Sequence, residues 1–143
     1  MFIGEYQYTL DEKKRVAIPS KFRQELGKKA ILTRGLDGCL FLFSKKEWEK
    51  LAQKLESLPL GQADARGFRR LMLAGAMEVT LDRLGRILIP DYLKKYAGLS
   101  KKVVIVGVGN HLEIWNEETW KKYQEKSERE IGDMAERLSQ LGI

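Results

Sequence analysis

The feature that most constrains this chain of 143 residues is a phrase that it contains twice. The sequence TLDEKKRVAIP at residues 9–19 returns as TLDRLGRILIP at residues 80–90, with Thr, Leu, Asp, Arg, Ile and Pro at matching places. After a one-residue slip, the similarity continues as far as Trp48 and Trp120. Self-similarity at a fixed spacing indicates a chain that is built from two copies of one structural unit.

Both copies predict the same order of elements: strand, turn, strand, short helix, two strands and a closing helix. Apolar and polar residues alternate in the first strand, which is the pattern of a half-buried strand. The apolar positions are Tyr6, Tyr8 and Leu10 in the first copy and Met77, Val79 and Leu81 in the second. A proline then ends the second strand of each copy. We expect Ser20 and Asp91 to cap the next helix, and Gly27 and Gly98 to end it.

The size of the unit indicates that neither copy folds alone. A domain of roughly 40 residues is near the limit below which metal or disulfide support is needed. We therefore predict an α+β protein in which the two copies share one core with pseudo-two-fold symmetry. The expected segments are a first repeat at 5–47, a linker with a helix at 57–75, a second repeat at 76–119 and a C-terminal helix at 116–141.

An apolar stripe of heptad type runs along the predicted C-terminal helix. Its members are Trp120, Tyr123, Ile131, Met134, Leu138 and Leu141. Such a stripe either packs on its own domain or forms a contact between subunits, and the spacing is compatible with both.

Several function classes find no support in the sequence. No apolar run is long enough to cross a bilayer, and a single cysteine, Cys39, fits a reducing compartment. One histidine, His111, which we expect on a strand, gives neither an ordinary zinc site nor a nucleophile–base pair. We therefore predict a cytoplasmic protein that is not an enzyme and has no metal, cofactor, membrane or small-molecule substrate as partner.

The chain is basic, with a formal net charge of +6 and a pI near 9.4. Residues 121–143 carry five basic and five acidic side chains, so the excess lies in the repeats and the segment between them. A basic surface indicates an anionic partner, of which nucleic acid is the commonest. The alternative is an ordinary solvated lysine surface.

Each copy places an arginine four residues after an aspartate, across a tight turn. Asp11 with Arg15, and Asp82 with Arg86, fit a structural ion pair that fixes the loop. The same arginines also suit contacts with a phosphate or a guanine edge. The two roles are compatible if the aspartate orients the arginine toward an outside partner.

The doubled TLDxxxRxxIP phrase, followed by a short helix and paired strands, resembles the swapped-hairpin DNA-binding fold of AbrB-type regulators. With MFIGEYQYTLDEKKRVAIPSKFR at its start, the chain closely resembles the bacterial MraZ family over almost its whole length. The resemblance implies two AbrB/SpoVT-like β-α-β repeats forming one swapped-hairpin, barrel-like core with flanking helices. It also implies a transcriptional regulator of the division and cell-wall gene cluster, which forms ring-like homo-oligomers on double-stranded DNA in the nucleoid.

The residues of the motif carry the expected roles. The resemblance implies that Arg15 and Arg86 bind DNA and that Asp11 and Asp82 orient the loops. Charge adds Lys13 and Lys14 in the first loop and Arg83 in the second, and favours the first loop as the stronger contact. The rival function is a non-DNA oligomeric adaptor that uses the C-terminal helix. A second rival is an antitoxin-like regulator of the same fold, which would need an adjacent toxin gene and a toxin-binding tail.

Overall fold

The computed structural model describes residues 1–143, and its elements follow the predicted order. The first repeat contains β1 (Phe2–Thr9), β2 (Arg15–Ala17), α1 (Ser20–Leu26), β3 (Lys29–Arg34), β4 (Leu40–Ser44) and α2 (Lys45–Glu56). The second contains β5 (Met77–Thr80), β6 (Arg86–Leu88), α4 (Asp91–Tyr96), β7 (Lys102–Gly109), β8 (Leu112–Asn116) and α5 (Glu117–Arg137). Between the repeats lies α3 (Ala63–Ala74), and a short 3₁₀ helix, η1 (Ser139–Leu141), follows α5.

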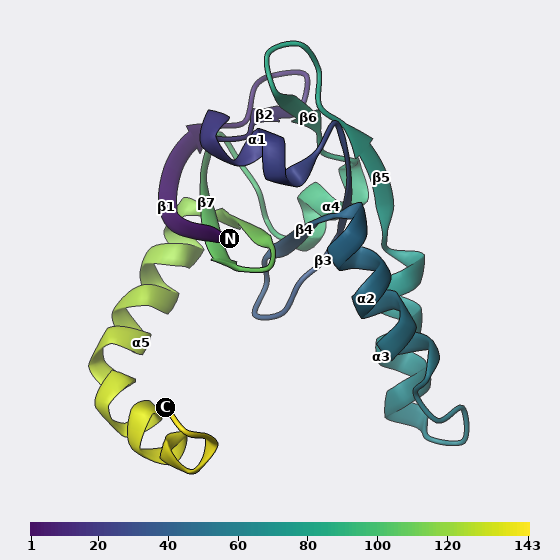
Figure 1. The fold of residues 1–143 in the computed structure, drawn as a ribbon. Coiled ribbons are helices and arrows are strands. Elements are labelled where there is room, and N and C mark those ends of the chain that lie inside the picture. The colour runs from purple at the N-terminus through teal and green to yellow at the C-terminus, as the bar shows by residue number, and fades with distance from the viewer.

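Each repeat gives its first strand to the other repeat. β1 pairs antiparallel with β7 over its full length, starting with Phe2 opposite Gly109. β5 pairs in the same way with β3, starting with Lys29 opposite Thr80. The resulting six-stranded sheet has the order β1-β7-β8-β4-β3-β5, so its two edges are the exchanged strands. This is the swapped-hairpin arrangement, and it confirms the predicted fold class, although β1 and β5 do not pair to close the barrel (Figure 1).

A two-stranded ribbon, β2 with β6, joins the repeats at their symmetry axis. Val16 stands opposite Ile87 at its centre. The ribbon continues at both ends, since the amide of Ile18 donates to Gly85 O at 2.9 Å and that of Ile89 donates to Lys14 O at 2.8 Å. These matching bonds place the two Asp–Arg loops side by side at one end of the molecule (Figure 1).

One hydrophobic core serves both repeats. It contains 21 buried residues, among them Val16 and Ile18 from the first copy and Ile87 and Ile89 from the second. The alternation in β1 is confirmed, because Tyr6, Tyr8 and Leu10 face this core. The shared core explains why a unit too small to fold alone occurs twice in the chain, because each copy buries its apolar side chains against the other.

The predicted N-caps of the two short helices are wrong. Ser20 and Asp91 are the first helical residues, and the preceding Pro19 and Pro90 occupy the cap position without a side-chain hydrogen bond. The carbonyl of each proline accepts the amide three residues on, so the hydrogen bonding of the helix begins at the proline although its side chain caps nothing. The predicted glycines do end these helices, with positive φ values of 87° and 58°.

Two helical arms extend from the end of the molecule opposite the loops (Figure 1). One is α5, whose first turn is capped by the Asn116 side chain. Trp120 and Tyr123 of the heptad stripe pack on Trp115 of β8, but Ile131, Leu138 and Leu141 are exposed. The other arm is the hairpin of α2 and α3. No helix combines the length and the apolar character that crossing a bilayer requires.

The one histidine lies outside the strands. His111 is in the turn between β7 and β8, where its carbonyl accepts the Val108 amide at 3.1 Å, so the expected strand position is wrong. Its ring stacks on Phe43 with a centroid separation of 4.8 Å. Burial lowers the pKa of this imidazole, which therefore packs as a neutral aromatic ring.

Candidate nucleic-acid interface

The first Asp–Arg loop is fixed by a single carboxylate. Oδ1 of Asp11 accepts the backbone amides of Lys13 at 2.9 Å and Arg15 at 2.8 Å. Oδ2 accepts Nε of the Arg15 guanidinium at 2.9 Å. An aspartate that binds amides two and four residues ahead closes the turn. Because it also binds Nε, it sets the direction of the arginine and leaves both Nη groups for another acceptor.

The second loop repeats this geometry. Asp82 accepts the amides of Leu84 and Arg86, both at 2.9 Å, and Nε of Arg86 at 2.8 Å. The two arginine side chains are also equally exposed, at 30% in the first loop and 29% in the second. The structural ion pair is therefore present in both copies. The geometry of the two loops gives no ground for ranking one arginine above the other.

Both aspartates have a lowered pKa. The main cause for Asp11 is the hydrogen bond from the Arg15 amide, to which the Arg15 guanidinium adds. The Arg86 amide and guanidinium act in the same way on Asp82. Hydrogen bonds to the ionised form favour that form, so the carboxylates are charged whenever the loops are intact.

We expect the loops to lose their order only in acid. The folded-state pKa of each aspartate lies below its unfolded value, so the stabilisation is complete above pH 4 or so and disappears as the pH falls through the lowered pKa. Carbon-13 NMR of the carboxyl groups measures this directly. In Arg15→Ala, the pKa of Asp11 should return only part of the way, because the amides remain. An ordinary pKa for both aspartates in the wild type would contradict this account of the loops.

The other predicted cations differ between the loops. Lys14 adopts a positive φ of 62°, and its ammonium pairs with Asp91 of the second repeat. Gly85 takes the matching place in the second loop, with φ of 74°. Lys13 and Arg83 are both exposed. The dense charge of the first loop is thus partly neutralised, since two of its three cations already have carboxylate partners.

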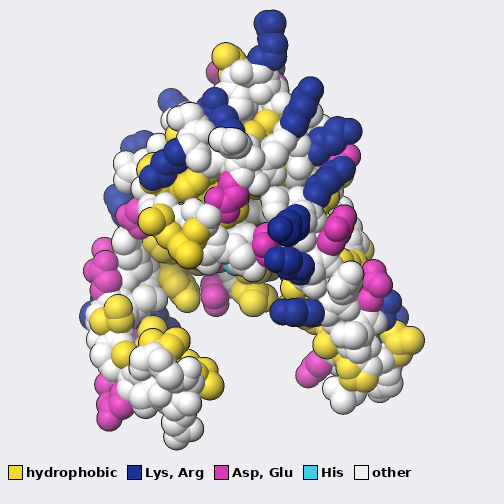
Figure 2. Space-filling model, in the orientation of Figure 1, with side chains coloured by type: hydrophobic (Ala, Val, Ile, Leu, Met, Phe, Trp, Pro, Cys, Tyr) yellow, Lys and Arg dark blue, Asp and Glu magenta, His cyan; other side chains and the backbone are white.

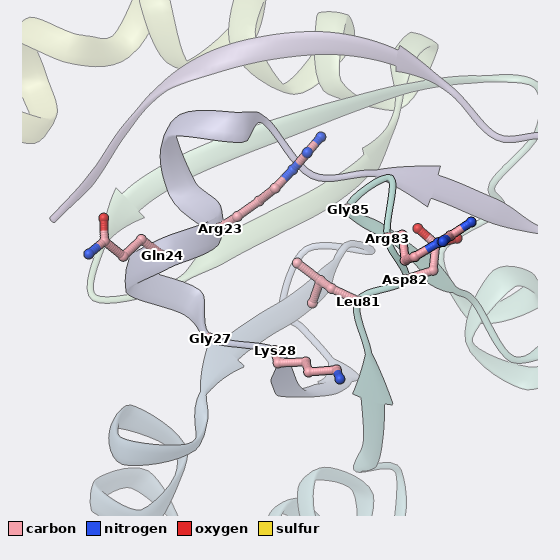
Figure 3. Close-up of a pocket in the computed structure, with 8 residues that line it drawn as sticks. All are labelled: Arg23, Gln24, Gly27, Lys28, Leu81, Asp82, Arg83 and Gly85. Carbon is pink, nitrogen blue, oxygen red and sulfur yellow. The ribbon is translucent and has the colours of Figure 1, made fainter.

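Two related hollows flank the loops and bring in cations that the sequence pattern did not reveal. The first, of about 390 Å³, joins Arg23 and Lys28 of the first repeat to Asp82 and Arg83 of the second. Figure 3 shows Arg23 reaching from α1 toward the loop at Gly85, with Gln24 pointing the other way. The second hollow is lined by Thr9, Leu10, Asp11, Glu12, Lys14, Lys94, Ser100 and Lys101. In the sequence, these cations are visible only as basic residues that follow the motif. Their place beside the loop of the other repeat results from the exchange of strands, which the sequence pattern does not show.

Basic side chains surround this end of the molecule (Figure 2). They also extend down the α2–α3 arm, whose segment 45–74 has seven basic and four acidic residues. The α5 arm differs, with seven acidic and five basic residues at 117–137. The charge of the molecule is therefore divided between a basic loop end with one basic arm and an acidic second arm.

Comparison with known proteins identifies the family. The family model "MraZ protein, putative antitoxin-like" matches twice, at residues 1–71 and 72–141. The chain belongs to the MraZ family. Three relatives named "Transcriptional regulator MraZ" match over the full length of both chains: those of Syntrophomonas wolfei at 48% identity, Caldicellulosiruptor saccharolyticus at 50% and Acetivibrio thermocellus at 50%. The double match to the MraZ model coincides with the two copies seen in the sequence and confirms the resemblance.

Proposed function

We propose that this protein is a sequence-specific DNA-binding transcriptional regulator. It acts as an oligomer on repeated elements upstream of the division and cell-wall gene cluster, in the cytoplasm at the nucleoid. The names of its MraZ relatives support regulation of transcription. The observation that carries the DNA contact is the pair of Asp–Arg loops, each with a guanidinium held by Nε at the basic end of the molecule.

The loops suit direct contact with bases. The major groove admits a two-stranded β-ribbon, and β2 with β6 is such a ribbon, with an arginine on each strand. We assign Arg15 and Arg86 to base edges and Lys13, Lys14 and Arg83 to phosphates, with Asp11 and Asp82 as the orienting residues. Phosphate contacts position a protein on the duplex, whereas base contacts specify the sequence.

The arms support self-association. The acidic α5 arm and the basic α2–α3 arm of a second copy are complementary in charge, and the exposed Ile131, Leu138 and Leu141 supply apolar surface. A contact between different faces of two identical subunits propagates, and it closes into a ring when the rotation permits. Several loops on one assembly then bind several DNA repeats, so that weak contacts combine into strong binding.

A mobility-shift assay with the DNA upstream of the protein's own gene tests the proposal. We expect discrete shifted bands that survive competition by unrelated DNA. Affinity should fall steeply with salt, with a slope of about −0.9 per phosphate neutralised. Light scattering on the free protein should give a mass several times that of one chain. A flat salt response, or equal affinity for unrelated DNA, would argue against this function.

The non-DNA adaptor is the second candidate, and the exposed apolar end of α5 favours it. The same two measurements separate the candidates. An oligomer that shifts neither its upstream DNA nor unrelated DNA at low salt is an adaptor. An oligomer that shifts the upstream DNA selectively is the regulator.

A further inference from the structure

The hollow beside the second loop is more positive than its symmetry-related counterpart. Its cations are Arg23 and Lys28 from the first repeat and Arg83 from the second. Its one acid, Asp82, already holds Arg86. Three cations therefore line this hollow without a carboxylate left to neutralise them.

The counterpart at the first loop has a different balance. Lys94 and Lys101 line it, but Glu12 is an unpaired acid, and Lys14 pairs with Asp91. The pseudo-two-fold symmetry of the backbone is thus broken by side chains. An anion that approaches both hollows meets a stronger positive field at the second loop.

Gly85 makes room for the arginine in this hollow. A Cβ at position 85 would lie 2.1 Å from Nε and Cζ of Arg23, so the guanidinium rests on the bare backbone of the loop. Nε of Arg23 donates to Ile18 O at 2.9 Å, which fixes the direction of the side chain. Arg23 is held in the same way as Arg15: Nε binds the protein, and the two Nη groups are left for an outside acceptor.

Lys28 and Arg83 complete the site from two sides. Lys28 is in the corner between α1 and β3, and the amide of Leu81 donates to its carbonyl at 2.8 Å. This bond connects the corner to the strand that leads into the second loop. Both side chains are exposed and carry no ion pair in the structure, so they can turn toward a ligand at little cost.

We propose that Arg23, Lys28 and Arg83 form a phosphate site beside the second loop that has no equivalent in the hollow beside the first. The proposal rests on the proposed function, and it adds residues and an asymmetry to it. One phosphodiester bound here anchors the DNA strand that runs past the second loop, while Lys94 and Lys101 of the related hollow add little to the contacts of Lys13 and Lys14. Arginine and lysine are the residues that neutralise backbone phosphates.

The test compares two matched variants by fluorescence anisotropy with the upstream duplex. The triple variant Arg23→Gln, Lys28→Gln, Arg83→Gln should bind roughly tenfold or more weakly than wild type, and its salt slope should be shallower by about one. The matched pair is two double variants: Lys28→Gln, Arg83→Gln should bind several-fold more weakly than wild type, whereas Lys94→Gln, Lys101→Gln, which removes the same charge from the related hollow, should bind within about twofold. Equal losses in both would overturn the asymmetry, and an unchanged triple variant would overturn the site.

Two additions keep the result clear. Arg23 also supports the loop through its bond to Ile18 O, so the triple variant can lose structure. If its helical circular dichroism falls, the double variant Lys28→Gln, Arg83→Gln replaces it in the binding measurement. A scan with single neutral methylphosphonates should find one phosphate whose neutralisation weakens the wild type but leaves the variant unaffected. If the scan finds no phosphate of this kind, the proposed site is wrong. If the wild type itself does not distinguish its upstream DNA, the proposed function fails first, which is a different outcome.

The phosphate of DNA must also be distinguished from a free anion. Millimolar inorganic phosphate, added at constant ionic strength, should not displace the duplex from the wild type. Displacement from the wild type and not from the triple variant would show that the hollow selects a free anion, and would overturn the assignment to the DNA backbone.

Discussion

Replacing Arg15 by alanine should remove specific DNA binding and leave the fold intact. Each arginine–base contact is worth about 1–3 kcal/mol of discrimination, and the several loops of the proposed oligomer multiply that loss. The expected affinity for the upstream DNA therefore falls to the level for unrelated DNA. Stability should change little, because the Asp11 carboxylate keeps both of its backbone amides and a partly exposed ion pair contributes little to stability.

Three further variants sharpen the Arg15 experiment. Arg15→Lys keeps the positive charge but lacks the planar guanidinium that makes two parallel hydrogen bonds. The variant should therefore lose binding if Arg15 contacts a base, and keep it if Arg15 contacts a phosphate. Lys102→Ala removes one exposed charge from β7, outside both loops, both hollows and both arms, and should bind nearly as wild type. Arg86→Ala should lose affinity comparably, because both loops hold their arginines alike. Wild-type binding by Arg15→Ala would refute its role in DNA recognition, and loss of the folded state would mean that the residue is structural.

Replacing Ile87 by alanine should unfold both repeats together. Ile87 is fully buried at the centre of the ribbon, opposite Val16. Removing a buried isoleucine side chain to alanine costs about 2–5 kcal/mol, a large fraction of the stability of a small domain. Since the core draws on both copies, urea unfolding followed by circular dichroism and by tryptophan fluorescence should shift by the same amount, in one transition.

The neighbouring residue provides the control. Leu88 is on the same short strand but is 58% exposed, so Leu88→Ala should stay within about 0.5 kcal/mol of wild type. Two separate transitions in Ile87→Ala would show that the repeats fold independently. In that case the exchange of β1 and β5 would not bind the halves into one cooperative unit.

Much of the fold follows from local patterns in the sequence. The repeat predicted the two units, and alternation in residues 5–10 predicted a half-buried strand, because both depend on neighbouring residues. The caps at Ser20 and Asp91 were wrong because Pro19 and Pro90 take the cap position one residue earlier. Asp91 pairs with Lys14 of the other repeat, a contact between residues 77 positions apart that no local pattern shows.

The candidate site likewise has a part that the sequence predicted and a part that it did not. The spacing of Asp11 and Arg15 predicted the bond between them, since four residues of a tight turn bring the side chains together. The hollow with Arg23 and Arg83 was missed, because its two sides come from different repeats. Once β1 and β5 are exchanged, the loop of one copy lies against the helix of the other, and only the tertiary structure brings their charges into one place.

The exchange of strands within a single chain also bears on the kind of DNA element that fits the protein. Two identical subunits with a true two-fold axis read a palindrome, since each presents the same residues to its half-site. Here the halves are covalently joined and carry different residues at matching places, such as Lys14 and Gly85. The two ends of the paired loops therefore differ, and the protein has a defined orientation along the duplex. Under the proposed function, each DNA element has a direction, and the proposed repeated elements all point the same way.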